Sequence, residues 1–342
     1  MPKPRWHTGG VPVPLVVLVG PTATGKSRLA VDVALALAES GQPAEIINAD
    51  SMLVYRGMDI GTAKPTEAER RGVPHHLIDI AEVTERTSVA EFQTLARGVI
   101  ARLRDAGTVP IVVGGSALYT RAITDHFDFP GSDDEVRARW EAELARVGPH
   151  ELHRRLAEIA PESAAKIEPG NGRRTVRALE VAELTGGHRP SLPEWTYELS
   201  DVHQFGLWLD RAELDARIDG RVEQMWADGL VEEVRALLDR GLREGETAVR
   251  AIGYRQVVQF LDGELSEREA KAAVQRATRT FFRKQLGWYR RDPRITWLDA
   301  TSASNVAAVL AGIGLGTTAE GEVGASIQLP QGARDPERLH HP

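Results

Sequence analysis

Short apolar runs alternate with segments of helical periodicity along the first part of the chain. The apolar runs, each typical of a strand, cover residues 15–19, 44–47, 77–80 and 110–113. Helical patterns fill residues 28–38 and 89–104. Strands that are separated by helices form parallel sheets, which helices cover on both faces. The pattern therefore predicts an α/β fold with a parallel sheet flanked by helices.

The pattern changes near residue 125, where Pro130, Gly131 and Ser132 mark a break before charged, mostly helical sequence that runs to about Gly187. A strand is then predicted at 203–209, followed by helical stretches at 213–240, which Gly229 interrupts, and at 267–290. We expect a core made of residues 14–124 and 200–313, with a helical insertion at 125–199. Residues 1–13 and 314–342 carry little pattern, which predicts a flexible N-terminus and a disordered tail.

Composition narrows the function classes. The 342 residues include no cysteine, which excludes disulfides, Cys-ligated zinc and thiol nucleophiles. No apolar run is long enough for a membrane segment, so we expect a soluble, cytoplasmic protein without a membrane partner. A net charge of −7 argues against a nucleic-acid partner. Two basic clusters, at residues 173–177 and 276–294, argue the other way, although such runs are more often solvated helix faces.

Residues 20–27, GPTATGKS, form a complete phosphate-binding loop between the strand at 15–19 and the helix that follows. Gly20 and Gly25 allow the backbone to curl so that its N–H groups point at phosphate oxygens, and Lys26 adds a positive charge. Ser27 can reach a magnesium ion, so Mg²⁺ is the expected cofactor with Ser27 as its ligand. The predicted phosphate-binding residues are Gly20, Pro21, Thr22, Ala23, Thr24, Gly25, Lys26 and Ser27. The motif alone does not say whether the phosphates belong to ATP.

Asp50 follows the strand at 44–47, which places its carboxylate at the carboxyl edge of the sheet, beside the phosphate loop. It can serve there as a general base. It can equally cap a following helix, because Asp is a favoured N-cap residue. Residues 111–116 put two glycines and the hydroxyl of Ser116 at the same edge.

Five segments together resemble the bacterial tRNA dimethylallyltransferases: GPTATGKS, NADSMLVYRGMDIGTAKPT, PHHLIDI, VVGGSALY and RAIGYRQ. The match spans roughly residues 15–300, and the 57–65 stretch is far more specific than a phosphate loop. The resemblance implies a P-loop NTPase-like fold. It also implies transfer of a dimethylallyl group from dimethylallyl diphosphate to the exocyclic N6 amine of the adenosine 3′-adjacent to a tRNA anticodon.

The resemblance also implies roles for individual residues. It indicates a catalytic role for Asp50, Lys26, Thr22 and Arg255. The predicted tRNA contacts are Asp50, Ser51, Met52, Leu53, Ser116, Arg137, Arg173, Arg174, Thr175, Val176, Arg177, Arg250, Gly253, Tyr254 and Arg255. Ser116 stands where the family usually has threonine. The target base must leave its stack to react, so the insertion is expected to clamp the anticodon stem.

Three other functions compete with this one. A P-loop small-molecule kinase would use ATP through the same loop. A prenyltransferase for free adenine nucleotides would need neither the insertion nor its arginines, and an RNA-binding module would need neither Lys26 nor Asp50. The expected partners are a tRNA anticodon stem-loop and dimethylallyl diphosphate. The protein itself is expected to be a monomer. Trp288 and Trp297 are predicted to be core residues.

Overall fold

The computed structural model describes residues 12–127, 129–186 and 194–315. They divide into two compact units. The first, which we call the core unit, combines the chain up to Asp125 with the chain from Tyr197 onward, and the second, the helical unit, is His126–Thr196. The helical insertion was predicted at 125–199, and the predicted tails at 1–13 and 314–342 lie almost wholly outside the described residues.

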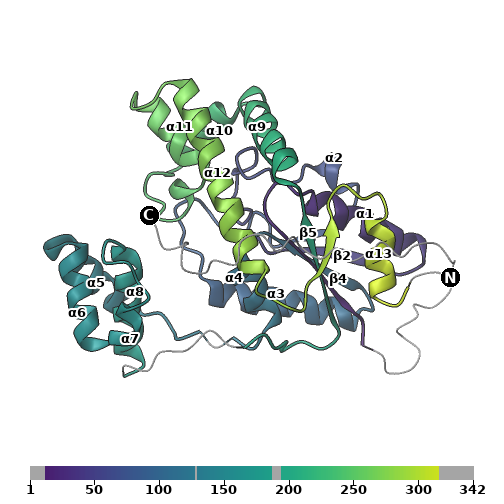
Figure 1. Ribbon diagram of the computed structural model, residues 1–342, viewed down its shortest axis with the longest axis horizontal. Helices are drawn as coiled ribbons and strands as arrows, with labels where there is room; N and C mark the ends of the chain where they lie inside the picture. The colour runs from purple at the N-terminus through teal and green to yellow at the C-terminus, as the bar shows by residue number, and fades with distance from the viewer. Residues whose placement is uncertain (1–11, 128, 187–193, 316–342) are drawn as a thin grey trace. The chain divides into compact units, whose positions relative to one another are not determined.

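Six parallel strands form the sheet of the core unit, in the order β3-β2-β4-β1-β5-β6 (Figure 1). The strands are β1 (Leu15–Val19), β2 (Ala44–Asn48), β3 (His75–His76), β4 (Val109–Gly114), β5 (Val202–Trp208) and β6 (Thr296–Asp299). The predicted α/β fold is therefore confirmed. Because every pairing is parallel, the carboxyl ends of the strands meet at one edge of the sheet.

Helices cover both faces of this sheet (Figure 1). Those of the core unit are α1 (Lys26–Glu39), α2 (Glu67–Arg70), α3 (Val89–Asp105), α4 (Ala117–Thr124), α9 (Arg211–Ala227), α10 (Leu230–Asp239), the short 3₁₀ helix η2 (Ala248–Arg250), α11 (Tyr254–Leu261), α12 (Glu267–Tyr289) and α13 (Asn305–Gly312). Val16 and Leu18 of β1 pack with α1 and α13, whereas Val17 and Val19 pack with α3. The alternation follows from the two-residue period of a strand, and burial on both faces explains why β1 is apolar throughout.

Several local predictions are confirmed. Gly229, with φ of 101°, separates α9 from α10 in the stretch predicted as one interrupted helix. The predicted final helix is α12, in which Phe282 and Tyr289 are buried. Trp297 is buried in β6 as predicted.

Two local predictions are wrong, and one strand was missed. The strand predicted at 77–80 lies instead at His75–His76, because Leu77 and Asp79 adopt φ values of 61° and 55°, which no extended strand allows. Strand β6 was not predicted. Trp288 is 37% exposed on α12 rather than in the core.

The helical unit contains α5 (Asp134–Val147), α6 (Pro149–Ile159), α7 (Pro161–Ala164) and α8 (Gly172–Leu184). Its own apolar cluster includes Leu152 and Leu156 of α6 together with Val176 and Leu179 of α8. An N-cap begins α5, since the Asp133 carboxylate accepts hydrogen bonds from the amides of Glu135 and Val136. The unit thus has a core that does not depend on the sheet.

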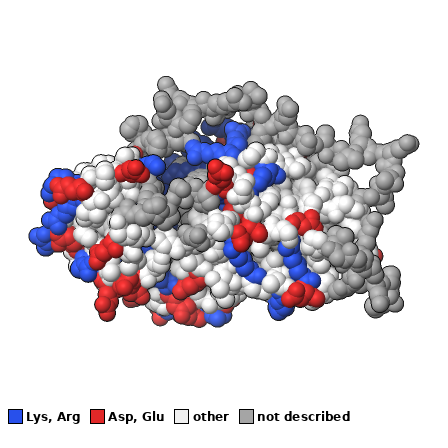
Figure 2. Space-filling view, turned by 90° about the horizontal axis from the view of Figure 1, so that it is seen from below, with Lys and Arg blue, Asp and Glu red and all other residues white. Residues whose placement is uncertain are grey.

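The surface carries charges of both signs. On the face shown in Figure 2, Lys and Arg side chains are interspersed with Asp and Glu. Among the residues that the structure describes, no helix combines the length and the apolar character needed to cross a bilayer. The charges on this face alone therefore do not mark a binding surface.

Candidate active site

A cavity of about 240 Å³ lies at the carboxyl edge of the sheet. Its walls come from the phosphate loop, the turns after β2 and β4, the 57–65 loop, and helices α9 and α12. Its polar lining includes Thr22, Lys26, Ser27, Asn48, Asp50, Thr62, Arg221 and Gln285. The structure thus brings the phosphate loop and Asp50 into one site, as the sequence predicted.

The phosphate loop is shaped by two glycines. Gly25 has φ of 89° and begins α1, while Gly20 has φ of 136°. A Cβ atom on Gly20 would lie 2.8 Å from the carbonyl oxygen of Leu207 in β5, so only glycine fits against that strand. Thr24 is buried, and its hydroxyl donates to the carbonyl oxygen of Pro21 over 2.9 Å. The loop is therefore a preformed turn at the amino end of a helix, which is the arrangement that binds phosphate.

Lys26 faces the cavity beside a second cation, Arg221, which was not predicted. Its ammonium group donates to the carbonyl oxygen of Pro21 over 2.6 Å. Burial lowers the pKa of Lys26 to about 8, against the opposing effect of the Asp50 carboxylate, and the charge of Arg221 adds to the lowering. Burial also lowers the pKa of Arg221, which Asp50 again opposes. Two half-buried cations and a carboxylate that interacts with both form a site that favours an added anion.

Asp50 is held by its own local turn. Its amide donates to Asn48 Oδ1 over 2.8 Å, and its Oδ1 accepts from the amide of Met52 over 2.9 Å. Residues 51–54 form turns rather than a helix, so the alternative of a helix cap is excluded. No described residue donates a hydrogen bond to Asp50 Oδ2. One carboxylate oxygen thus fixes the side chain, and the other is available to accept a proton.

Gln285 of α12 is another cavity residue that was not predicted. Its Oε1 accepts from the amide of Thr22 over 3.0 Å, and its Nε2 donates to the carbonyl oxygen of Gly115 over 2.8 Å. A Cβ atom on Gly115 would lie 2.6 Å from that nitrogen, so the glycine makes room for the amide. Gln285 therefore links the phosphate loop to the turn after β4.

Other predicted site residues lie near the cavity or away from it. Met52 and Ser51 are half-buried beside Asp50, Leu53 lines the cavity, and Ser116 begins α4 next to Gly115. Arg250, at the end of η2, and Arg255, in the first turn of α11, are exposed, and neither lines the cavity. The arginine that lines the cavity together with Asp50 is Arg221, which was not predicted.

Two residues predicted to contact RNA in this segment are enclosed by protein. Tyr254 is 0% exposed, and Gly253 is buried beside it. The Tyr254 hydroxyl donates to Glu233 Oε1. Because the Tyr254 side chain is fully buried, it cannot contact RNA directly. It acts through its contacts inside the core unit.

The predicted RNA contacts of the helical unit fall into three groups. Arg173 and Arg174 are exposed on the first turn of α8, and no described residue pairs with either guanidinium. Arg137 and Arg177 both bind the carboxylate of Glu180, which is fully buried. Thr175 and Val176 are buried, so their side chains contribute to the unit's core.

The cavity contains donors suited to magnesium but no complete metal site. Within the ranges that the structure describes, no three His, Cys, Asp or Glu side chains are grouped as a metal centre. Mg²⁺ usually binds one or two protein oxygens and completes its shell with phosphate oxygens and water. Ser27 and Asp50 both line the cavity, so the Ser27 hydroxyl fits the role of a protein oxygen ligand for Mg²⁺.

Comparisons with known proteins agree with this geometry. Residues 53–292 match the IPP transferase family. A tRNA dimethylallyltransferase of Kineococcus radiotolerans is 59% identical over 297 residues, which cover 86% of this chain and 93% of the relative. The chain belongs to the IPP transferase family.

Solved structures extend the family assignment to the fold. The tRNA isopentenylpyrophosphate transferase of Bacillus halodurans superposes with a TM-score of 0.63 at 38% identity, over 88% of this chain and 97% of the other. A eukaryotic dimethylallyltransferase, described as acting on tRNA, superposes with a TM-score of 0.68 at 25% identity. The superposition covers 85% of this chain and 74% of the other. The resemblance in the sequence is thereby confirmed, and this IPP transferase has the P-loop architecture of its relatives.

Proposed function

We propose that this IPP transferase moves a dimethylallyl group from dimethylallyl diphosphate to the exocyclic N6 amine of the adenosine 3′-adjacent to a tRNA anticodon, giving N6-dimethylallyladenosine and diphosphate. The observation that supports this proposal most is the single cavity that holds a phosphate loop, two half-buried cations and Asp50. The named relatives carry the same activity in their names. The protein would act in the cytoplasm as a monomer.

The bond changes assign work to Asp50. The N6 lone pair attacks C1 of the allylic donor, the C1–O bond breaks, and diphosphate leaves with the bonding electrons. An adenine amine is a weak nucleophile because its lone pair is delocalised into the ring. Asp50 Oδ2 accepts the N6 proton as the new C–N bond forms, while Oδ1 stays bonded to the amide of Met52.

The leaving group needs positive charge as it departs. The loop amides, Lys26 and Arg221 surround the place where the diphosphate would lie. When bound, Mg²⁺ would neutralise further charge on the diphosphate oxygens, with Ser27 as its protein ligand. Lys26 and Arg221 would each contact phosphate oxygens directly, and the Arg221 fork can bind two of them.

Recognition of tRNA would use both units. In the core unit, residues 50–53 would hold the edge of the flipped adenine, and Ser116, Arg250 and Arg255 would contact the RNA nearby. In the helical unit, the exposed guanidinium groups of Arg173 and Arg174 would bind phosphates of the anticodon stem.

A transfer assay separates this function from its competitors. Purified protein is incubated with Mg²⁺, labelled dimethylallyl diphosphate and one acceptor, either an anticodon stem-loop with consecutive adenosines or free AMP. Label is expected in the stem-loop alone. Label in AMP but not in the stem-loop would overturn the tRNA assignment, and transfer of phosphate from labelled ATP with no prenyl transfer would indicate a kinase.

A further inference from the structure

Glu233, on the first turn of α10, receives an unusual set of hydrogen bonds. Its Oε2 accepts from the amides of Asp59 and Ile60 over 3.1 and 2.7 Å. Its Oε1 accepts from the amide of Gly61 over 3.2 Å and from the Tyr254 hydroxyl over 2.5 Å. One carboxylate therefore anchors three consecutive amides of the 57–65 loop, and bonds to an ionised acceptor are stronger than neutral ones.

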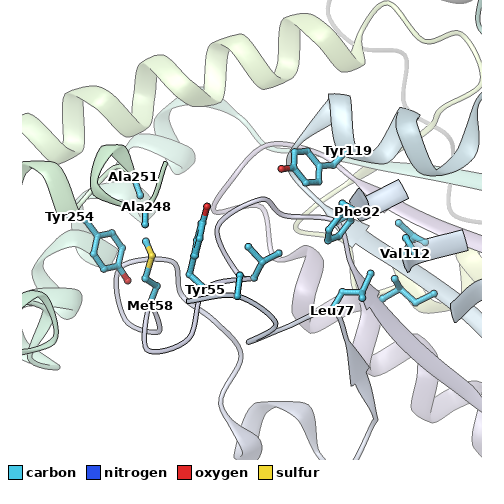
Figure 3. Packing of buried hydrophobic residues seen from close by; sticks show 14 of the residues in the cluster. Tyr55, Met58, Leu77, Phe92, Val112, Tyr119, Ala248, Ala251 and Tyr254 are labelled. Carbon is cyan, nitrogen blue, oxygen red and sulfur yellow. The ribbon is translucent and has the colours of Figure 1, made fainter. Parts of the chain in front are cut away.

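Tyr254 fixes this carboxylate from the other side. Its ring is fully buried beside Met58, a residue of the same loop (Figure 3). A Cβ atom on Gly61 would lie 2.5 Å from that ring, so the glycine lets the loop approach it. Burial, together with the neighbouring Glu233 charge, raises the pKa of Tyr254, so the hydroxyl remains a donor. Loop, tyrosine and carboxylate thus form one rigid arrangement.

The loop that Glu233 anchors is a wall of the cavity. Thr62, Ala63 and Pro65 line it opposite the start of α1. Ala63 and Pro65 also line a neighbouring cavity, so the loop separates the two. A guanidinium nitrogen of Arg221 lies 3.5 Å from the carbonyl oxygen of Thr62, which ties a cation of the site to the same wall.

The loop has a second anchor that does not involve Glu233. Lys64 is buried, and its ammonium group donates to the carbonyl oxygen of Tyr55 over 2.8 Å and to Asp79 over 2.5 Å. With Glu233 removed, this anchor would still hold the end of the loop at Lys64. Lys64 also pairs with Asp59 over 2.6 Å, so the loop would then shift at residues 60–63 without unfolding the core unit.

We propose that Glu233, held by Tyr254, is a positioning residue that fixes residues 59–63 as the wall of the donor cavity and so sets the affinity for the allylic diphosphate. The inference rests on the proposed function for the identity of the donor. It also explains why Tyr254 is buried within a segment whose arginines are exposed. Arg250 and Arg255 flank a tyrosine whose contacts lead to the cavity wall and not to solvent.

The test uses Glu233→Ala and Glu233→Gln in the full chain, with Glu232→Gln as the matched control. Glu232 is the exposed neighbour on α10 and pairs only with Arg235 among the described residues. Calorimetry with inorganic diphosphate and Mg²⁺ measures the affinity for diphosphate. Hydrogen exchange measures how fast the backbone amides of residues 59–61 exchange with solvent. A displaced catalytic wall can cost one to two orders of magnitude, so we expect affinity to fall about tenfold or more in Glu233→Ala.

Several readouts distinguish positioning from a loss of folding. In Glu233→Ala the loop amides should exchange faster while amides of β1 keep wild-type rates, and KM for the donor should rise more than kcat falls. Glu233→Gln, which keeps an acceptor oxygen, should recover part of the affinity, and Tyr254→Phe should lose only a few-fold because its ring remains. Affinity for the anticodon stem-loop should not change.

Two outcomes would overturn the proposal. One is unchanged diphosphate affinity in Glu233→Ala despite faster exchange of the loop, and the other is unchanged exchange. A different result would refute the proposed function: a wild-type protein that binds diphosphate but transfers no prenyl group. The loop measurements would still stand in that case.

Discussion

The cations of the cavity and those of the helical unit differ in what surrounds them. Lys26 and Arg221 are half-buried in the wall of the cavity, and burial lowers the pKa of each. Arg146 and Arg154 are exposed and pair with glutamates on their own helices. A half-buried cation without a full set of partners is costly unless an anion arrives, whereas an exposed ion pair contributes little.

The comparison shows that the arginines predicted to contact tRNA differ in whether protein groups already pair with them. Arg137 and Arg177 were predicted to contact tRNA, yet both bind the buried Glu180. Burial acts to raise the pKa of Glu180, but hydrogen bonds from Arg177 and Arg137 outweigh it and lower the pKa. Arg173 and Arg174 are the members of the cluster that remain accessible to a phosphate.

The largest effect is expected in the cavity, from Asp50→Asn. The amide keeps an oxygen for the Met52 N–H, so the turn survives, but it cannot accept the N6 proton. We expect kcat to fall about 10²- to 10⁴-fold while affinity for the stem-loop stays within twofold. Single-turnover transfer and filter binding measure the two quantities, with Asp105→Asn, an exposed residue, as the control. Equal losses of binding and turnover would show that Asp50 is structural.

The next effect concerns pH, because Lys26 carries its charge only below its pKa of about 8 in the free protein. A bound diphosphate raises that pKa, so affinity should be constant near pH 7 and fall about tenfold by pH 9. Calorimetry with diphosphate and Mg²⁺ across this range measures it. Lys26→Met provides the baseline for ionisation of the probe itself, and identical pH dependence in both proteins would contradict the assignment.

A smaller effect is expected from the double variant Arg173→Ala, Arg174→Ala. Each phosphate contact releases counterions, so the loss of two should reduce the slope of log affinity against log salt by about 1.4 to 1.8. Fluorescence anisotropy with a labelled stem-loop at several salt concentrations measures the slope. The control removes Arg146 and Arg154, which are paired with glutamates, and an equal loss of slope there would mean that no specific cluster binds RNA.

The smallest effect on transfer is expected from Arg137→Met, which should act on stability instead. Glu180 would keep Arg177 but lose a charged hydrogen-bond partner, so the free energy of unfolding should fall by about 1–3 kcal/mol. Urea denaturation measures it, with the exposed Arg139→Met as the control. Because the pKa of Glu180 is lower in the folded state, its stabilising contribution should be lost as pH falls below the ordinary value of 4.5. An undiminished stability with weakened tRNA binding would restore Arg137 as a direct contact.

Local motifs explain which parts of the fold were predictable. The phosphate loop and β1 are contiguous in the chain and buried on both faces, so their pattern is strong. Strand β3 has only two residues. The apolar run at 77–80 was predicted to be a strand, but the left-handed backbone at Leu77 makes it a turn. Strand β6 has only four residues and follows a basic run that hides its apolar pattern.

The missed site residues have a different cause. Arg221 and Gln285 lie in helices α9 and α12, where nothing in the neighbouring sequence distinguishes them from the other polar residues of those helices. Each reaches the cavity only because β5 pairs with β1 and brings the C-terminal helices alongside. Such residues become visible when the sheet order is known, whereas Asp50 could be placed from its position after a strand.

The hydrogen bond between Thr22 and Gln285 joins residues 263 positions apart, which has a consequence for synthesis on the ribosome. A nascent chain that ends before β5 already contains the phosphate loop, but it lacks the strand against which Gly20 packs and the amide that holds Thr22. Diphosphate could not find a finished site on such a chain. The phosphate-loop site is therefore completed only after α12 has been synthesised, however early its most recognisable motif is made.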